Sequence, residues 1–355
     1  MIRMPDPSMY FLAIESSCDE TAAAVFDATP RVLASVVASQ TDLHARFGGV
    51  VPEVAARAHL QRLLPVVDEA LRRAGIGIRD IGAVAVMNSP GLVGALLVGV
   101  SAAKMFALAL NVPLVAVNHI EAHIYACRLA AERDVFPCIG LVVSGGHTSL
   151  FHCRSALDFA LLGATIDDAA GEAFDKVASM LGLGFPGGPA VERIARDGNP
   201  QAFAFPRAFL RDPRLDFSFS GLKTAVLYAL RALAPEGSSG PTSQSKSDLA
   251  ASFQQAVIDV LVEKSRQALE STRLKVLSVG GGVAANGAFR QGLESMAARH
   301  GYMLVIPPLA LCTDNAAMAA LAVEKWKAGQ LAPLDLDAEP TYVGPRRETL
   351  PAAKA

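Results

Sequence analysis

The sequence predicts an α/β protein built from a duplicated unit of strands and helices. Short apolar runs typical of buried strands alternate with longer segments that carry apolar residues at helical spacing. A strand, a small polar turn and a second strand occur near residue 11, and the same pattern restarts near residue 139. The chain has 355 residues, of which 52% are hydrophobic and 19% charged, so it can bury a large core.

The first half of the chain is expected to alternate strands and helices after a short leader over residues 1–8. Residues 9–27 form a strand, a polar turn and a strand, and residues 52–74 have the apolar spacing of an amphipathic helix. The next elements are a buried strand over 81–87, a helix over 92–110, a buried strand over 112–117 and a helix over about 119–133.

The second half repeats this order with longer insertions. The predicted elements are a hairpin over 138–153, a helix over 167–181, a turn over 185–189, a long helix over 248–271, a strand over 275–279 and a helix over 286–300. Residues 234–248 are rich in Ser, Gly and Pro and predict a flexible insert. The segment after Leu331 is predicted to be a peripheral tail.

Charge and cysteine content exclude several classes of protein. The formal net charge of −2 argues against a protein that coats nucleic acid through bulk charge, although a local basic patch stays possible. Five cysteines without a C-x-x-C pair indicate a reducing compartment. The apolar region 91–117 is broken by Lys104 and Pro113, which favours a buried helix; we expect a cytoplasmic protein with no membrane association.

The motif H-I-E-A-H at 119–123 is the sharpest chemical feature. On a helix, His119 and His123 lie one turn apart on one face, where two imidazoles can bind one metal ion or can be ordinary buried histidines. Glu121 faces away, so the motif does not match a zinc peptidase. Asp314, in C-T-D-N-A-A-M, is the best candidate for a third ligand, but it could equally cap the following helix.

Three glycine-rich turns suit a nucleotide. They comprise Val142, Val143, Ser144, Gly145 and Gly146 after a strand, the run 280–282 between a strand and a helix, and the turn 185–189. Glycine lets the backbone approach an anionic ligand, although such turns are often only turns. None matches the phosphate-binding loop G-x-x-x-x-G-K-[ST] or a complete dinucleotide fingerprint.

Several carboxylates and one basic stretch each allow two interpretations, one functional and one structural. Asp175 can accept hydrogen bonds from a ribose, and Asp19 and Glu20 in the first hairpin turn can orient a metal, water or amine; each is otherwise a surface or turn residue. Residues 193–231 hold seven Lys or Arg against three Asp, interleaved with phenylalanines, which is typical of an RNA-facing surface or of an ordinary one.

Eight motifs in order resemble the TsaD family, the tRNA N6-adenosine threonylcarbamoyltransferases. They are E-S-S-C-D-E-T (15–21), V-N-H-I-E-A-H (117–123), L-V-V-S-G-G-H-T (141–148), G-E-A-F-D-K-V-A (171–178), F-P-G-G-P (185–189), F-S-F-S-G-L-K-T-A (217–225), G-G-V-A-A-N (281–286) and C-T-D-N-A-A-M (312–318). The resemblance covers about residues 10–325 and indicates a bacterial-type member.

The resemblance implies an actin-like ATPase (ASKHA) fold with two related α/β lobes around a central cleft. The expected lobes span residues 9–135 and 136–330, with the flexible insert 234–248 in the second, and residues 331–355 as a peripheral tail. It also implies transfer of threonylcarbamoyl from threonylcarbamoyl-AMP to N6 of adenosine 37 in tRNAs that read ANN codons. Expected partners are tRNA, a TsaB-like paralogue and a TsaE-like ATPase.

The resemblance also implies roles for particular residues. One divalent ion, Fe²⁺ or Zn²⁺, is expected on His119, His123 and Asp314. The adenylate is expected to be bound by the segment Val142 to Gly146 with Asp175, Gly188 and Asn286; Glu192 stands where many relatives have Asp and is one methylene longer. Asp19, with Glu20 second, is the candidate base or amine-orienting group. The alternative function is an actin-like-fold ATPase or small-molecule kinase, since the fold permits both.

Overall fold

The computed structural model describes residues 9–233, 240–341 and 347–348, and these form two compact units. The first unit contains residues 9–134, 155–159 and 307–341. The second contains residues 135–154, the described part of 160–306, and 347–348. The first unit is therefore assembled from stretches that lie far apart in the sequence.

The first unit is built on a five-stranded sheet with the strand order β3-β2-β1-β4-β5. Its strands are β1 (Tyr10–Glu15), β2 (Glu20–Asp27), β3 (Val32–Ser39), β4 (Ile81–Ser89) and β5 (Leu114–Asn118). The neighbours β1–β2 and β2–β3 are antiparallel, whereas β1–β4 and β4–β5 are parallel. The carboxyl ends of β1, β4 and β5 thus meet at one edge of the sheet.

The second unit repeats this order as β8-β7-β6-β9-β10. Its strands are β6 (Cys138–Val143), β7 (Thr148–Ser155), β8 (Asp158–Ala164), β9 (Val276–Gly280) and β10 (Met303–Val305). The pair β6–β7 is antiparallel, and β6–β9 and β9–β10 are parallel. The predicted duplication of an α/β unit is confirmed, because β6 takes the place of β1 and β9 that of β4.

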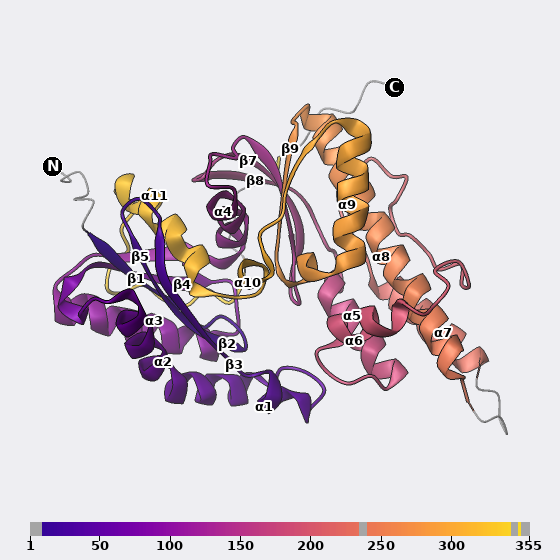
Figure 1. Ribbon diagram of the computed structural model, residues 1–355, viewed down its shortest axis with the longest axis horizontal. Helices are drawn as coiled ribbons and strands as arrows, with labels where there is room; N and C mark the ends of the chain where they lie inside the picture. Colours follow the sequence, from indigo (N-terminus) through magenta and orange to yellow (C-terminus); the bar gives the residue numbers. More distant parts are fainter. Residues whose placement is uncertain (1–8, 234–239, 342–346, 349–355) are drawn as a thin grey trace. The chain divides into compact units, whose positions relative to one another are not determined.

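Helices cover both faces of the first sheet (Figure 1). They are α1 (Thr41–Ala45), α2 (Pro52–Ala74), α3 (Val93–Leu110), α4 (His119–Ala131), α10 (Leu309–Cys312) and α11 (Leu321–Lys327), with short 3-10 turns at Ile78–Asp80 and Ala316–Ala320. Along β1, Leu12 and Ile14 pack with α2 and α3, whereas Phe11 and Ala13 pack with α4 and α11. This two-residue alternation is the reason that strands buried on both faces appear as continuous apolar runs.

The helices of the second unit are α5 (Ala170–Leu181), α6 (Gly187–Ala195), α7 (Ser220–Ala232), α8 (Ser243–Thr272) and α9 (Gly287–His300), with a 3-10 turn at Gly282–Ala285. Figure 1 shows α8 and α9 running beside each other next to β9. The predicted helices and strands from residue 9 to 300 are confirmed in position. Two strands, β3 and β8, and the helices α1, α6 and α7 were not predicted.

Three predicted boundaries differ from the structure. The insert expected over 234–248 is wrong for residues 243–248, which form the first turns of α8 because Thr242 caps the helix through the Ser245 amide; residues 234–239 lie outside the described part. The turn at 185–189 ends in α6 from Gly187. Residues 307–330, which the sequence placed in the second lobe, pack in the first unit, and Ala332 N donates to Leu114 O at 2.8 Å.

Helix α3 is, within the described residues, the one helix long and apolar enough to cross a membrane by length and composition alone. Its residues Ala95, Leu96, Val100 and Ala103 are buried in the first unit. This is the arrangement expected of a helix that packs on a sheet with one face, and the predicted burial holds for that face only, because Val93, Leu97 and Leu108 on α3 are exposed.

A buried lysine fixes the loop that contains Asp212 and Arg214 in the second unit. Lys264 on α8 has no exposed surface, and its Nζ donates to Asp212 O at 2.6 Å, Arg214 O at 2.8 Å and Gln267 Oε1 at 2.9 Å. Burial lowers the pKa of Lys264, so three acceptors are needed to keep its ammonium group inside the protein.

We expect Lys264→Met to lower the free energy of unfolding by about 1–3 kcal/mol, because the carbonyl groups of Asp212 and Arg214 lose their donor. Chemical denaturation measures this loss. Lys327→Met, at an exposed position on α11, is the matched control and should change stability by less than about 0.5 kcal/mol. Equal stability of the two variants would show that the ammonium contacts contribute nothing.

Candidate functional site

The two histidines of H-I-E-A-H begin α4 directly after β5 ends at Asn118. The Asn118 side chain caps the helix, because its Oδ1 accepts hydrogen bonds from Ile120 N at 2.9 Å and Glu121 N at 3.2 Å. This cap places His119 in the first turn and His123 one turn later, with ring centroids 4.6 Å apart. The predicted pairing of the imidazoles on one helix face is thereby seen directly.

Asp314 completes a triangle with these histidines. His119 Nε2 lies 3.2 Å from His123 Nε2, and Asp314 Oδ1 lies 3.4 Å from the first and 3.3 Å from the second. Donor atoms at about 2.1 Å from a tetrahedral ion are themselves about 3.4 Å apart. The triangle therefore has the size that a single divalent ion requires. Asp314 follows α10, and its alternative role as a helix cap falls to Asn315 instead.

Of the three side chains in this triangle, Asp314 is the most accessible. His119 is 5% exposed and His123 is not exposed, whereas the Asp314 side chain keeps 21% of its surface accessible. Two protein nitrogens and one oxygen leave a fourth position for a substrate atom, as catalytic metal sites do.

Glu15 supports the triangle from the end of β1. Its Oε2 lies 2.9 Å from His119 Nδ1 and accepts that N–H, while its other oxygen accepts from Ser17 N. With Nδ1 protonated, His119 Nε2 keeps its lone pair for a ligand bond. His123 lacks such support, because within the described residues its buried Nδ1 has no hydrogen-bond partner. The sequence did not single out Glu15, since it lies 104 positions from His119 in the chain.

The charges in the site favour positive charge next to the carboxylates of Asp314 and Glu15. Burial alone would lower the pKa of His119, but Asp314 and Glu15 raise it well above the ordinary value. Burial lowers the pKa of His123, and it would raise that of Asp314, which His119 instead holds well below its usual range. Two buried carboxylates beside two imidazoles thus require one positive charge among them.

The carboxylates of the first hairpin turn lie near this triangle. Burial and the charge of Asp314 raise the pKa of Asp19. Burial is also the main reason that the pKa of Glu20 rises to about 7, and Asp19 and Asp314 add to it. Glu20 Oε1 accepts from Ser39 Oγ at 2.8 Å, while its buried Oε2 has no partner within the described residues.

Glu121 takes no part in this group. Its carboxylate lies 4.0 Å from Lys325 Nζ of α11, as expected for a residue about half a turn away from the histidines. The structure thus agrees with the exclusion of a peptidase motif.

In the second unit, the glycine turn after β6 is tightly held at its base and open at its tip. Ser144 N donates to His147 O at 2.8 Å, and Gly171 N of α5 donates to Ser144 O at 3.2 Å. A Cβ at Gly171 would lie 2.5 Å from Ser144 O, so only glycine permits this approach. A Cβ at Gly145 or Gly146 would meet nothing within 4 Å, which leaves space beside the turn for a ligand.

The run after β9 packs against the same turn. Gly281 has a φ of +94°, and a Cβ there would lie 2.4 Å from Val143 O. Asn286 follows and caps α9: its Oδ1 accepts from Phe289 N at 2.9 Å, while its Nδ2 donates to Gln254 Oε1 at 2.8 Å. The carboxyl ends of β6 and β9 are therefore joined by glycine contacts.

The remaining predicted residues hold helix N-termini. Asp175 Oδ1 accepts from Gly187 N of α6 at 2.7 Å, next to Gly188, which has open space where a Cβ would be. Glu192 Oε1 accepts from Gly287 N of α9 at 3.1 Å. These contacts place Asp175, Gly188, Glu192 and Asn286 around neighbouring helix ends of one unit.

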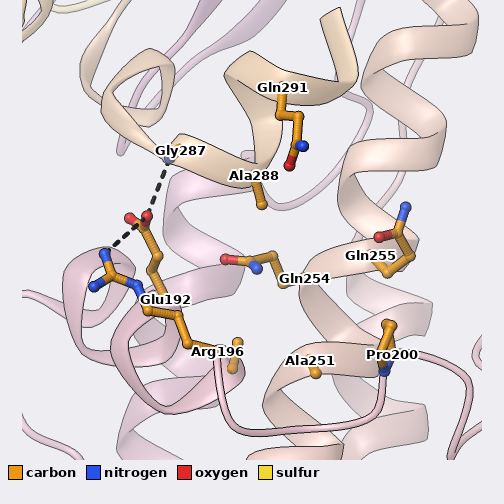
Figure 2. Close-up of a pocket in the computed structure, with 10 residues that line it drawn as sticks. Glu192, Arg196, Pro200, Ala251, Gln254, Gln255, Gly287, Ala288 and Gln291 are labelled. Carbon is orange, nitrogen blue, oxygen red and sulfur yellow. Dashed lines mark hydrogen bonds and ion pairs between the residues drawn. The ribbon is translucent and has the colours of Figure 1, made fainter. Parts of the chain in front are cut away.

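A cavity of about 360 Å³ lies beside these helix ends. Figure 2 shows Glu192 between Arg196 and Gly287, with Gln254 and Gln291 pointing into the space. The volume is within the range of small-ligand sites. Gln254 and Gln291 were not predicted, because two isolated glutamines on different helices give no sequence signal.

Within the basic and aromatic stretch, several residues that could face RNA by composition are engaged inside the protein or in ion pairs. Phe205, Phe217 and Phe219 are buried, so they cannot stack on bases. Arg207 is paired with Asp259 at 2.9 Å, and Arg214 is paired with Asp212 at 2.8 Å. The ordinary reading, a solvated surface over core phenylalanines, fits these residues better.

Comparisons with known proteins agree with this geometry. Residues 31–321 match the model of the TsaD family, described as tRNA N6-adenosine threonylcarbamoyltransferase. A protein of that name from Rhodopirellula baltica is 53% identical over 94% of this chain and 97% of its own length. Another from Bacillus subtilis is 52% identical over 88% of this chain and 89% of its own.

Solved structures show the fold. The Acidaminococcus fermentans (R)-2-hydroxyglutaryl-CoA dehydratase component A is 16% identical, with a TM-score of 0.51 over 90% of this chain and 99% of that one. Full-length HypF in a phosphate- and nucleotide-bound form is 12% identical, with a TM-score of 0.60 over 93% of this chain and 56% of that one. The expected actin-like ATPase fold with two related α/β lobes is confirmed. With its sequence, its duplicated sheets and its histidine–aspartate triangle in agreement, the chain belongs to the TsaD family of tRNA N6-adenosine threonylcarbamoyltransferases.

Proposed function

We propose that this protein transfers the threonylcarbamoyl group from threonylcarbamoyl-AMP to N6 of adenosine 37 in tRNAs that read ANN codons. The observation that carries the proposal is identity above 50% along almost the whole chain to tRNA N6-adenosine threonylcarbamoyltransferases. The product is N6-threonylcarbamoyladenosine. The triangle of His119, His123 and Asp314 supports the proposal, since a simple kinase of the same fold does not need it.

One Fe²⁺ or Zn²⁺ ion is proposed on His119 Nε2, His123 Nε2 and Asp314 Oδ1. The spacing of these atoms and the excess of buried negative charge support it. When bound, the ion supplies a Lewis acid that neutralises charge on phosphate or carbonyl oxygens. Glu15 fixes the tautomer of His119, and the exposed edge of Asp314 leaves a route for a substrate oxygen.

The adenylate is proposed to bind in the second unit. The segment from Val142 to Gly146 offers backbone amides beside open space, and Asp175, Gly188, Glu192 and Asn286 lie at the neighbouring helix ends. Because Glu192 already accepts from Gly287 N, a ribose would have to share that carboxylate. The cavity next to it can take part of a nucleoside.

The reaction needs one proton acceptor. The N6 amine attacks the carbamoyl carbon, the bond to the phosphate oxygen breaks, AMP leaves, and the amine loses a proton. Glu20, with a pKa of about 7, accepts a proton near neutral pH more readily than an ordinary carboxylate does. Asp19 beside it orients the amine. Sequence reasoning ranked these two residues in the opposite order.

The partners proposed for the reaction are a TsaB-like paralogue and a TsaE-like ATPase, acting with tRNA in the cytoplasm. An apolar face supports docking of the paralogue on the first unit: Leu60 and Leu64 of α2 and Val93, Leu97 and Leu108 of α3 are 43% to 69% exposed. Helices α2 and α3 pack together, so these side chains belong to neighbouring elements.

Metal analysis by mass spectrometry tests the proposed ion. We expect about one ion per wild-type chain, and loss of it in His119→Ala and in Asp314→Ala because each removes a ligand. Glu15→Gln should weaken affinity about 10- to 100-fold, since the imidazole loses its charged support. His300→Ala, at an exposed position, is the control. A His119→Ala protein that still holds one ion would contradict the assignment.

An activity assay tests the proposed function. Purified protein with its partners, tRNA, threonine, bicarbonate, ATP and the first-step synthase should form N6-threonylcarbamoyladenosine, detected by nucleoside mass spectrometry. The His119→Ala/His123→Ala variant should lose about 100-fold or more of the rate, because several kcal/mol of transition-state stabilisation disappear. His300→Ala should keep its rate. Full activity of the double variant would remove the triangle from the mechanism.

The apolar face gives a separate prediction. Leu60→Asp/Leu108→Asp should raise the dissociation constant for the paralogue about 10-fold or more, because two exposed apolar side chains that the paralogue would cover become charged. Isothermal titration calorimetry measures it. Met303→Asp, exposed in the second unit, should bind as wild type does, and an unchanged constant for the double variant would exclude this face.

A further inference from the structure

The turn between β1 and β2 is held at three consecutive carbonyl groups. Leu92 N donates to Ser17 O at 2.8 Å, and Gln40 N donates to Asp19 O at 3.0 Å. Between them, His59 Nε2 of α2 lies 3.0 Å from Cys18 O. His59 provides the one anchor among these three that a side chain makes.

Hydrogen-bond chemistry fixes the tautomer of His59. A carbonyl oxygen only accepts, so Nε2 must carry the proton, and Nδ1 is then an acceptor. Thr21 Oγ1 lies 2.8 Å from that Nδ1 and donates to it, while Gln40 Nε2 lies 3.4 Å from Thr21 Oγ1 and donates there. Gln40 Nε2 also lies 3.3 Å from His59 Nδ1 and 3.4 Å from His59 Nε2; with this tautomer it can donate to Nδ1 but not to the protonated Nε2.

The chain of donors continues to a second buried histidine. Gln40 Oε1 accepts from His44 Nε2 at 3.4 Å, and His44 Nδ1 accepts from Val51 N at 3.2 Å. The side chains of Thr21, Gln40, His44 and His59 are all fully buried. A connected set of directional contacts therefore runs from the start of α2 to the Cys18 carbonyl.

These hydrogen bonds hold one side of the turn between β1 and β2, and the other side of that turn packs against α3 and the residues before it. A Cβ at Gly91 would lie 2.5 Å from Ser17 O, and one at Gly99 would lie 2.3 Å from Ser16 Oγ, so α3 closes tightly on the turn. Burial lowers the pKa of both His59 and His44, which keeps each imidazole neutral and its tautomer defined. Small displacements of the turn are resisted from both helices.

The turn carries Asp19 and Glu20 beside Asp314. We propose that His59 is a positioning residue for threonylcarbamoyl transfer, holding the Cys18 carbonyl so that these two carboxylates keep their place at the metal triangle. The inference rests on the proposed function. It assigns no contact between His59 and substrate, so its effect is on the rate of transfer and not on binding.

Two amide variants separate positioning from simple packing. In His59→Gln the amide nitrogen reaches the place of Nε2 and can still donate to Cys18 O. In His59→Asn the amide reaches only the place of Nδ1, so it can meet Thr21 but not the carbonyl. Both variants put a neutral amide of lower volume into the same buried site, which makes them matched controls for each other.

We expect His59→Asn to lower kcat about 10- to 100-fold and His59→Gln to stay within about 3-fold of wild type. KM for tRNA and metal content should be equal in the two variants, and the difference in kcat should persist at temperatures well below both Tm values, because His59→Asn also removes the donor to Cys18 O. If the wild-type protein is active, the proposed function stands. The inference about His59 would then be overturned by equal kcat in both variants, or by a loss of kcat that merely follows the loss of Tm. Absence of product with the wild-type protein would instead reject the proposed function.

A measurement without turnover keeps the inference testable if His59→Asn fails to fold. In the zinc-loaded or metal-free protein with ¹⁵N-labelled histidine, we expect the His59 ring to show a protonated Nε2 and an unprotonated Nδ1. Thr21→Val removes the hydroxyl donor and should lower kcat with KM unchanged. The opposite tautomer in the wild-type protein, or an unchanged kcat in Thr21→Val, would contradict the proposed role.

Discussion

The first unit depends on one electrostatic constraint: two imidazoles and two carboxylates share a small, largely buried space, which is stable only when positive charge lies among them. The ligand atoms of His119, His123 and Asp314 lie 3.2–3.4 Å apart, and Glu15 adds a second negative charge behind His119. Bringing such groups out of water is costly unless opposite charge compensates. The helix cap at Asn118 positions the two histidines, and the packing of residues 307–341 in the first unit brings Asp314 next to them.

The two units share a strand order but differ in the chemistry of their strand ends. In each sheet, the residues of interest follow the carboxyl ends of parallel strands: Glu15 after β1 and His119 after β5, Ser144 after β6 and Gly281 after β9. Open α/β sheets bind ligands at this edge. One copy presents charged side chains there, and the other presents backbone amides freed by glycine.

Sequence patterns predicted the features that depend on neighbouring residues along the chain. The continuous apolar runs identified the central strands, and the four-residue spacing identified the histidine pair. The strand β3 was not predicted because its buried positions alternate with exposed ones at the sheet edge. The start of α8 was not predicted because its first turn is polar and depends on the cap by Thr242. Glu15 and His59 were not predicted for another reason: each contacts a residue that is distant in the sequence.

The discontinuity of the first unit has a consequence for biosynthesis. His119 and His123 leave the ribosome long before Asp314, and the 3-10 turn and α11 that complete the same core follow Asp314. The second unit, encoded almost entirely between them, can fold first, although domains usually fold in the order of synthesis. The nascent chain therefore carries His119 and His123 without Asp314 until translation is nearly over, and the triangle of three side chains can form only after that.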